Sequence, residues 1–238
     1  MNALLAENEL HLWVVHATQA HPRRDQLLSL HEHSRARRFY KSIDGERWAY
    51  FHCALREILS GYTGLDPTEL EYGSIKNNKP VLTNREHSLN FNLSHSHNTA
   101  LIAIRGPGEI GVDIERVRTL KDMDAVAGRN FSAEENMSLS CASGRERCKL
   151  FYEIWTRKEA IIKANGRGLS IPLPQFTAPI GSAGHWQATT IEDHDRVKYL
   201  LCGLDLEPDY CSAVCIEFPS AQPVHNPTIN VHQYNLTF

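Results

Sequence analysis

Three residues in the second half of the chain have types and spacing that could act on a charged substrate. Trp155, Glu159 and Lys163 follow one another at intervals of four residues. On a helix this spacing places an aromatic ring, a carboxylate and an ammonium group along one face. The pattern is equally typical of a surface helix, where a Glu–Lys pair contributes a few tenths of a kcal/mol. Gly166 and Gly168 indicate where the helix ends.

A pair of carboxylates lies some forty residues earlier, within the sequence Gly-Val-Asp-Ile-Glu at 111–115. Alternate residues of a β-strand point to opposite faces, so Asp113 and Glu115 would share one face. Two such carboxylates repel each other unless a cation or solvent lies between them. Oxygen ligands suit Mg²⁺, which takes one or two carboxylates together with waters and substrate phosphates. A half-exposed strand with both carboxylates in water would give the same pattern.

Together the two segments resemble the motifs of a known enzyme family. Gly-Val-Asp-Ile-Glu, followed after about forty residues by Trp-x-x-Lys-Glu-Ala-x-x-Lys-x-x-Gly-x-Gly at 155–168, is similar to the pattern of the 4′-phosphopantetheinyl transferases, in particular the longer surfactin-synthetase type. The match is specific because two multi-residue motifs occur in the right order at a suitable distance. The resemblance covers most of residues 10–218.

The resemblance implies a reaction and its catalytic residues. Coenzyme A would be the substrate, and its 4′-phosphopantetheine arm would pass to a serine of an apo acyl or peptidyl carrier protein of fatty acid, polyketide or nonribosomal peptide synthesis, with release of 3′,5′-ADP. Asp113, Glu115 and Glu159 would bind Mg²⁺, for which Mn²⁺ can substitute. Glu159 would take the serine proton, directly or through water, and Lys163 would stabilise the departing phosphate. Lys158 would add to the anion site.

Two other functions are compatible with the residues alone. The same carboxylates could serve another Mg²⁺-dependent phosphoryl or nucleotidyl transferase. The basic group of the first half (Arg35, Arg37, Arg38 and Lys41) could belong to a non-catalytic nucleic-acid-binding protein, although the chain lacks an extended basic stripe interleaved with aromatic residues.

The same basic group is a candidate for binding the phosphates of coenzyme A. A guanidinium group binds phosphate well through two donors at once, although such runs commonly coat a solvated helix face. The family's Phe-Asn-x-Ser-His-Ser occurs at 91–96, and Asn78-Lys79-Pro80 resembles its Gly-Lys-Pro turn, whereas Glu32 stands where the family often has lysine. The coenzyme A contacts implied by the resemblance are Arg35, Arg47, Lys79, Pro80, Ser94, His95, Lys158 and Lys163.

Glycine and proline at 105–108 divide the chain into two parts of similar size. The resemblance implies an α+β fold of two pseudo-symmetric α/β halves, each with a small, mostly antiparallel sheet and a long helix, and an active site at their interface. We expect an N-terminal half at 1–107 with the coenzyme A contacts and a C-terminal half at 108–218 with the metal and catalytic residues. Residues 219–238 are expected to form a C-terminal tail.

Composition limits the remaining possibilities. The 238 residues are 42% hydrophobic and 22% charged, with a formal net charge of −3, which gives no overall attraction to nucleic acid or acidic membranes. No signal-like N-terminus or run of 18 apolar residues occurs, and the six cysteines show no CxxC spacing. We therefore expect a cytoplasmic protein with buried, reduced thiols that does not bind membranes or nucleic acid. Two halves in one chain favour a monomer.

Overall fold

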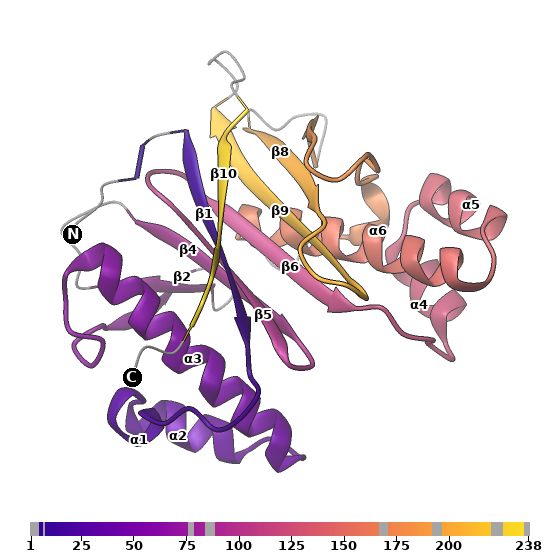
Figure 1. Cartoon of the computed structure of the whole chain (residues 1–238). Helices are drawn as coiled ribbons and strands as arrows, with labels where there is room; N and C mark the ends of the chain where they lie inside the picture. Colours follow the sequence, from indigo (N-terminus) through magenta and orange to yellow (C-terminus); the bar gives the residue numbers. More distant parts are fainter. Residues whose placement is uncertain are drawn as a thin grey trace.

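Two four-stranded sheets, each covered by one long helix, make up most of the described part of the chain (Figure 1). The computed structural model describes residues 5–6, 8–75, 79–83, 89–166, 171–191, 197–219 and 226–235. The predicted α+β fold with two halves and mostly antiparallel sheets is confirmed. Gly168 and Asn78, the first residue of the segment that resembles the Gly-Lys-Pro turn, lie outside the described residues.

The first sheet has the strand order β10-β1-β5-β4. Its strands β1, β5 and β4 are antiparallel, and β10 lies parallel to β1. One face is covered by α3, whose apolar stripe follows the helical spacing expected from the sequence. The elements of this half are β1 (Glu9–His16), α1 (Arg24–Leu27), α2 (Leu30–Arg37), α3 (Ser42–Thr63), the hairpin β2 (Tyr72–Ile75) and β3 (Lys79–Leu82), β4 (Asn90–Ser96) and β5 (Thr99–Arg105).

The second sheet is antiparallel throughout, with the order β6-β9-β8-β7. The long helix α6 packs on one of its faces. Ser132 caps α5 through a reciprocal pair of hydrogen bonds with Glu135. The elements are β6 (Ile110–Arg116), α4 (Met123–Asn130), α5 (Ala133–Cys141), α6 (Gly144–Asn165), a 3₁₀ turn (Leu173–Gln175), β7 (Trp186–Thr189), β8 (Val197–Leu204) and β9 (Tyr210–Pro219).

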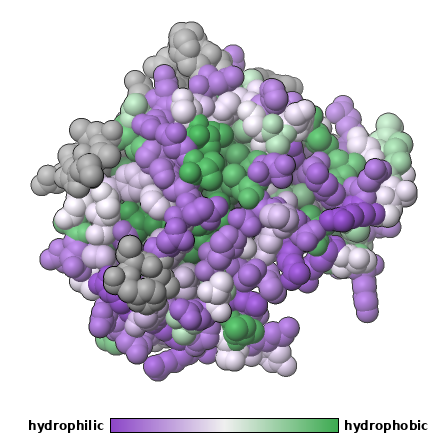
Figure 2. Space-filling model, in the orientation of Figure 1, coloured by the Kyte–Doolittle hydropathy of each residue, from purple (hydrophilic) through white to green (hydrophobic). Residues whose placement is uncertain are grey.

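The two sheets pack on each other through their remaining faces. Leu12 of β1 and Leu101 of β5 belong to the same buried cluster as Val112 of β6 and Val214 of β9. The layers therefore run helix, sheet, sheet, helix, with α3 and α6 outermost. In the view of Figure 2 most of the surface is hydrophilic, and hydrophobic side chains gather near its centre, over the strands. The junction of the two sheets is therefore a buried apolar interface.

One glycine sets the distance between α6 and β6. A Cβ atom on Gly111 would lie 2.1 Å from the carbonyl oxygen of Ala160 and 2.3 Å from the backbone nitrogen of Ala164, so no side chain fits between helix and strand. The helix ends at Gly166, whose φ of 71° is left-handed, as the glycine at this position predicts. The close approach brings the last turns of α6 against the strand that carries Asp113.

The last segment of the chain is a structural element, and its prediction as a tail was wrong. Residues Thr228–Gln233 form β10, paired in parallel with β1 from Glu9 to Val14. Tyr234 then donates its backbone N–H to the carbonyl of Val14 at 2.9 Å, and its hydroxyl bonds to Glu57 of α3. The chain thus returns from the second sheet to complete the first one.

The prediction that the cysteines are buried also needs correction, because Cys141 is exposed.

Candidate active site at the junction of the two sheets

Side chains of β4 connect this edge strand to β6 of the other sheet. Asn92 accepts the backbone N–H of Val112 at 2.9 Å, Ser94 donates to Asp113 at 2.6 Å, and Ser96 donates to Glu115 at 2.6 Å. The three β4 residues alternate along the strand and so share one face. Strand β4 runs through the two serines and ends at Ser96.

Asp113 is the centre of this junction. Its carboxylate is buried, and its Oδ1 atom accepts hydrogen bonds from the hydroxyl of Ser94 and from the ammonium of Lys163, both at 2.6 Å. Lys163 also donates to Ser94 at 3.0 Å and to the carbonyl of Val112 at 3.1 Å. The Oδ2 atom is buried and has no hydrogen-bond partner among the described residues. A buried carboxylate oxygen of this kind is a site for a further donor or a cation.

Glu115 and Glu159 place two more carboxylates near Asp113. Burial raises the pKa of Glu159, and the charges of Asp113 and Glu115 raise it further, against the opposing effect of Lys163. Burial also raises the pKa of Glu115, and the charge of Asp113 adds to this, although the hydrogen bond from Ser96 opposes it. The charge of Asp113 thus disfavours ionisation of both glutamates, and Glu115 acts in the same direction on Glu159.

The donor set suits a hard divalent cation, although no cage for one is preformed. Among the described residues no group of three or more histidine, cysteine, aspartate or glutamate side chains is arranged to hold a metal ion. Mg²⁺ is usually bound by only one or two carboxylates plus waters and substrate phosphates, so a complete protein cage is not required. The unpartnered Asp113 oxygen and the raised pKa values of the two glutamates fit such a partial site.

A pocket of about 1190 Å³ opens beside this junction. Lys163, Ser94 and His95 form the end next to the carboxylates, and the remaining walls come from α2, α3, the segment 68–73 and β3. The wall residues include Arg35, Trp48, Tyr72 and Pro80. A volume of this order accommodates a drug-sized or nucleotide-sized ligand.

His95 lines the end of the pocket next to the carboxylates and contacts α3. The imidazole stacks on Phe51 of α3, with ring centroids 5.2 Å apart. Burial lowers the pKa of His95 to about 4, and the charges of His52, Lys163 and Arg35 act in the same direction. His95 is therefore a neutral ring that gains from the approach of an anion, because negative charge favours protonation of a nearby imidazole. Ser94, His95 and Lys163 are brought together as the motifs predict.

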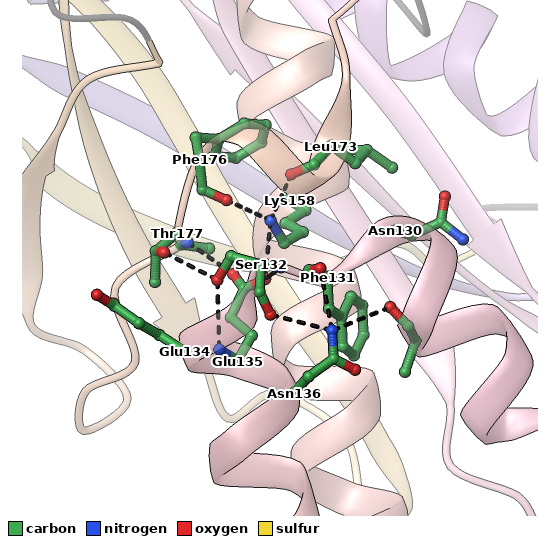
Figure 3. Close-up of polar contacts among 12 residues, drawn as sticks. Asn130, Phe131, Ser132, Glu134, Glu135, Asn136, Lys158, Leu173, Phe176 and Thr177 are labelled. Carbon is green, nitrogen blue, oxygen red and sulfur yellow. Dashed lines mark hydrogen bonds and ion pairs between the residues drawn. The ribbon is translucent and has the colours of Figure 1, made fainter.

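Lys158 does not reach the pocket, and its predicted role in the anion site is corrected. Its ammonium group is 1% exposed and forms an ion pair with Glu135 at 2.8 Å. It also donates to the backbone carbonyls of Leu173 and Phe176, at 2.8 Å and 2.5 Å. Figure 3 shows these contacts, through which Lys158 connects α6 to the start of α5 and to the segment that follows α6. The residue stabilises the second half of the chain.

Lys79 and Arg47 are also placed differently from their predicted roles. The ammonium of Lys79 pairs with Glu109 at 2.6 Å and donates to the carbonyl of Ile110 at 2.9 Å, so it joins the hairpin to the start of β6. Arg47 forms an ion pair with Asp44 at 3.2 Å. Neither residue lines the pocket, whereas Arg35 and Pro80 do.

The motifs miss several residues that the pocket brings together. His52 and Trp48 of α3, Tyr72 of β2 and the buried pair Glu32–Arg56 all belong to its walls. Trp48 and His52 are four residues apart on α3, so plotting this segment as a helix would have placed the two rings next to each other. The partners of Arg56 lie on another helix and a loop, and no local pattern indicates them.

Comparison with known proteins assigns the family. The model of the 4′-phosphopantetheinyl transferase superfamily matches residues 109–215, and the N-terminal model for the same enzyme activity matches residues 17–106. The 4′-phosphopantetheinyl transferase HetI of Nostoc sp. is 36% identical over 174 residues, which cover 71% of this chain and 73% of that protein. The chain belongs to the 4′-phosphopantetheinyl transferase superfamily.

Two further relatives extend the likeness over a larger part of the chain. The 4′-phosphopantetheinyl transferase psf-1 of Bacillus pumilus is 32% identical, over 82% of this chain and 81% of its own. The enzyme Sfp of Bacillus subtilis is 28% identical, over 81% of this chain and 83% of its own. These relatives support the predicted surfactin-synthetase type. No helix in the described part of the chain has the length and apolar character needed to span a membrane.

Proposed function

We propose that this protein transfers the 4′-phosphopantetheine arm of coenzyme A to a serine hydroxyl of an apo acyl or peptidyl carrier protein and releases 3′,5′-ADP. The observation that carries the proposal is the arrangement at the end of the pocket. There Ser94, Asp113 and Lys163 are joined to one another by hydrogen bonds. The carboxylates of Glu115 and Glu159 lie near Asp113. The family assignment supports the same reaction and no evidence favours the two alternative functions.

The pocket has the chemistry required to bind coenzyme A. Arg35 and Lys163 line it, and phosphate groups are bound most strongly by charged donors of this kind. The neutral ring of His95 also lines the pocket and can donate a hydrogen bond to a phosphate oxygen. The pyrophosphate of the substrate would lie beside Lys163, because the bond to be broken must be near the carboxylates. The ammonium group of Lys163 would then donate a hydrogen bond to the departing phosphate oxygen and stabilise the negative charge that develops there.

Mg²⁺ is the cofactor that we propose for the junction, and Mn²⁺ can substitute for it. Asp113, Glu115 and Glu159 would hold the ion, and the unpartnered Oδ2 atom of Asp113 is the observation that best supports this assignment. When bound, the ion neutralises charge on the pyrophosphate oxygens. The repulsion that raises the pKa values of the two glutamates would be relieved by a cation between them.

Glu159 is the proposed base for the attacking serine. A serine hydroxyl is a weak nucleophile until a base takes its proton. A general base acts best when its pKa lies near the working pH, and the pKa of Glu159 is raised by burial and by its carboxylate neighbours. Glu159→Gln should lower kcat by a factor of about 100 or more while coenzyme A binding survives. Wild-type turnover in this variant would remove Glu159 from the mechanism.

The direct test is the mass of a carrier protein. The purified chain is incubated with coenzyme A, Mg²⁺ and several apo carrier proteins from the three pathways named above. A mass gain equal to one phosphopantetheine group, abolished by serine-to-alanine replacement in the carrier, is the expected result. No mass gain with any carrier, under conditions where coenzyme A is bound, would point to a different acceptor. We further infer a monomer, because all the proposed site residues come from one chain. We also propose a cytoplasmic enzyme without nucleic acid or membrane partners, since the formal net charge of −3 gives no overall attraction to either.

A further inference from the structure

The wall of the pocket formed by α2 and α3 carries a stack that the proposed reaction leaves without a role. His52 stacks on Trp48, with ring centroids 3.7 Å apart and ring planes inclined by 27°. The guanidinium of Arg35 lies 5.4 Å from the centroid of the same Trp48 ring. All three side chains line the pocket. Because the imidazole is stacked on an indole that is itself buried, its plane is fixed before any ligand enters.

Glu32, which also lines the pocket, lies next to one of the two nitrogens of the His52 ring. The Oε1 atom of Glu32 lies 3.7 Å from Nδ1 of His52. Arg56 holds this carboxylate through its Oε2 atom at 2.8 Å, and the backbone N–H of Ser29 donates to the same oxygen at 2.8 Å. Since Nδ1 faces the buried carboxylate, Nε2 lies on the opposite edge of the ring. The side chain of His52 is 22% exposed, so a ligand in the pocket can reach it.

The charges around His52 favour an incoming anion. Burial lowers the pKa of His52, and Arg35 of α2 and Arg56 of α3 act in the same direction, whereas Glu32 raises it. His95 of β4 is a further titratable group whose pKa is affected by His52. Although burial acts to raise the pKa of Glu32, hydrogen bonds from His52, Arg56 and Ser29 lower it to about 2. Glu32 therefore stays ionised, paired with Arg56, and supports a positive charge on the imidazole.

We propose that His52 is a further substrate-binding residue, which donates its Nε2–H to the 3′-phosphate of coenzyme A. The proposal rests on the proposed function. The pyrophosphate of the substrate must lie beside Lys163 and Asp113, so the 3′-phosphate is the anionic group that remains for the wall with Arg35 and His52. Glu32 acts as a positioning residue for the imidazole. The affinity for the 3′-phosphate then depends on a proton that His52 takes up when coenzyme A binds.

The test is calorimetric binding of coenzyme A to the full chain at about pH 6 and about pH 8.5. His52→Gln should weaken binding about tenfold at the lower pH and less than about twofold at the higher pH, because a hydrogen bond between charged groups is lost only where the imidazole is protonated. Wild-type protein should take up more protons on binding than the variant, measured in buffers of different ionisation enthalpy. With 3′-dephospho-coenzyme A the wild type and the variant should bind equally.

Two variants separate binding from folding. His33→Gln is the matched control, because His33 is a half-buried histidine of the same helix pair that does not line the pocket; it should bind coenzyme A like the wild type. His52→Lys supplies a permanent cation, so it should keep high affinity at both pH values and lose the pH dependence. Equal weakening of coenzyme A and its dephospho form by His52→Gln, or weakening that does not change with pH, would overturn the assignment. Because the assay measures binding alone, a failure of carrier modification would be recognised separately.

Discussion

Gly111 offers the sharpest test of the idea that α6 and β6 must touch for catalysis. In Gly111→Ala the new methyl carbon would lie 2.1 Å from the carbonyl oxygen of Ala160. Since such contacts do not fall below 3.0 Å in real structures, helix and strand must separate by about 1 Å. The hydrogen bond of 2.6 Å between Lys163 of α6 and Asp113 of β6 joins this helix to this strand. The separation should therefore displace Lys163 and Glu159 from Asp113 by a similar amount.

The magnitudes follow from this displacement. Over-packing of a tight core costs on the order of 1–3 kcal/mol of unfolding free energy, and a misplacement of about 1 Å can lower the rate about 100-fold. Because Lys163 lines the pocket but the wall with Arg35 belongs to the other half of the chain, the dissociation constant of coenzyme A should rise by a much smaller factor than kcat falls. We would measure kcat from the release of 3′,5′-ADP, coenzyme A binding by calorimetry and the melting temperature by circular dichroism.

The matched control is Gly128→Ala, since a Cβ atom on Gly128 of α4 meets nothing within 4 Å. A glycine-to-alanine change inside a helix with open space should raise stability by about 0.5–1 kcal/mol and leave kcat unchanged. A folded Gly111→Ala protein with wild-type kcat would refute the reasoning, because the close approach would then be dispensable for the chemistry.

Three further predictions follow from the charges. The raised pKa of Glu159 means that its ionised form is disfavoured in the folded state. Glu159→Gln should therefore raise the melting temperature of the metal-free protein, measured by thermal unfolding, by a few degrees near pH 7.5. The increase should become smaller as the pH falls towards the ordinary pKa of a carboxylate. Lys158→Met should lower the unfolding free energy in a urea titration by about 3–5 kcal/mol, since Glu135 keeps a buried charge without its partner, whereas the KM for coenzyme A in the folded protein should stay within about twofold. Chelation of divalent ions should abolish transfer to the carrier, and Mg²⁺ or Mn²⁺ should restore it in the mass assay; full activity in excess chelator would contradict the assigned metal site.

The sequence predicted the carboxylates and Lys163 because each lies in a motif whose geometry is local. Asp113 and Glu115 share a face in any strand, and Glu159 and Lys163 share a face in any helix. The contact between the two elements came from the family resemblance, and the structure explains it by the missing side chain at Gly111.

Lys158 shows where a motif misled although the helical pattern was available. Its neighbours at i−4 and i+4, Ile154 and Ile162, are buried, so the periodicity of α6 places the lysine on the core face. The motif suggested an anion contact, and the helix period would have predicted a buried ion pair. Lys79 could not be placed in this way, because its partner Glu109 lies thirty residues away in another element.

The strand β10 was missed for a different reason. Ile229 and Val231 alternate with polar residues, which is typical of a half-buried strand, but the short segment follows a proline-rich stretch and has no local partner. Its partner β1 lies more than two hundred residues earlier. Pairing across such a distance depends on the position of the whole second sheet, which no local pattern contains.

The return of β10 also bears on how the site is kept together. The three carboxylates lie on β6 and α6 of the second half, and the pocket wall with Arg35 belongs to the first half, so the proposed catalysis requires a fixed relation between the two halves. Three contacts fix it: the buried cluster between the sheets, the side-chain bonds from β4 to β6, and the last strand, which starts from the second sheet and is anchored to α3 through Tyr234 and Glu57. The carboxylates repel one another and oppose the close packing of this junction. The apolar cluster and the returning strand supply the stability that this repulsion removes, and a cation bound with the phosphates of the substrate would supply it during the reaction.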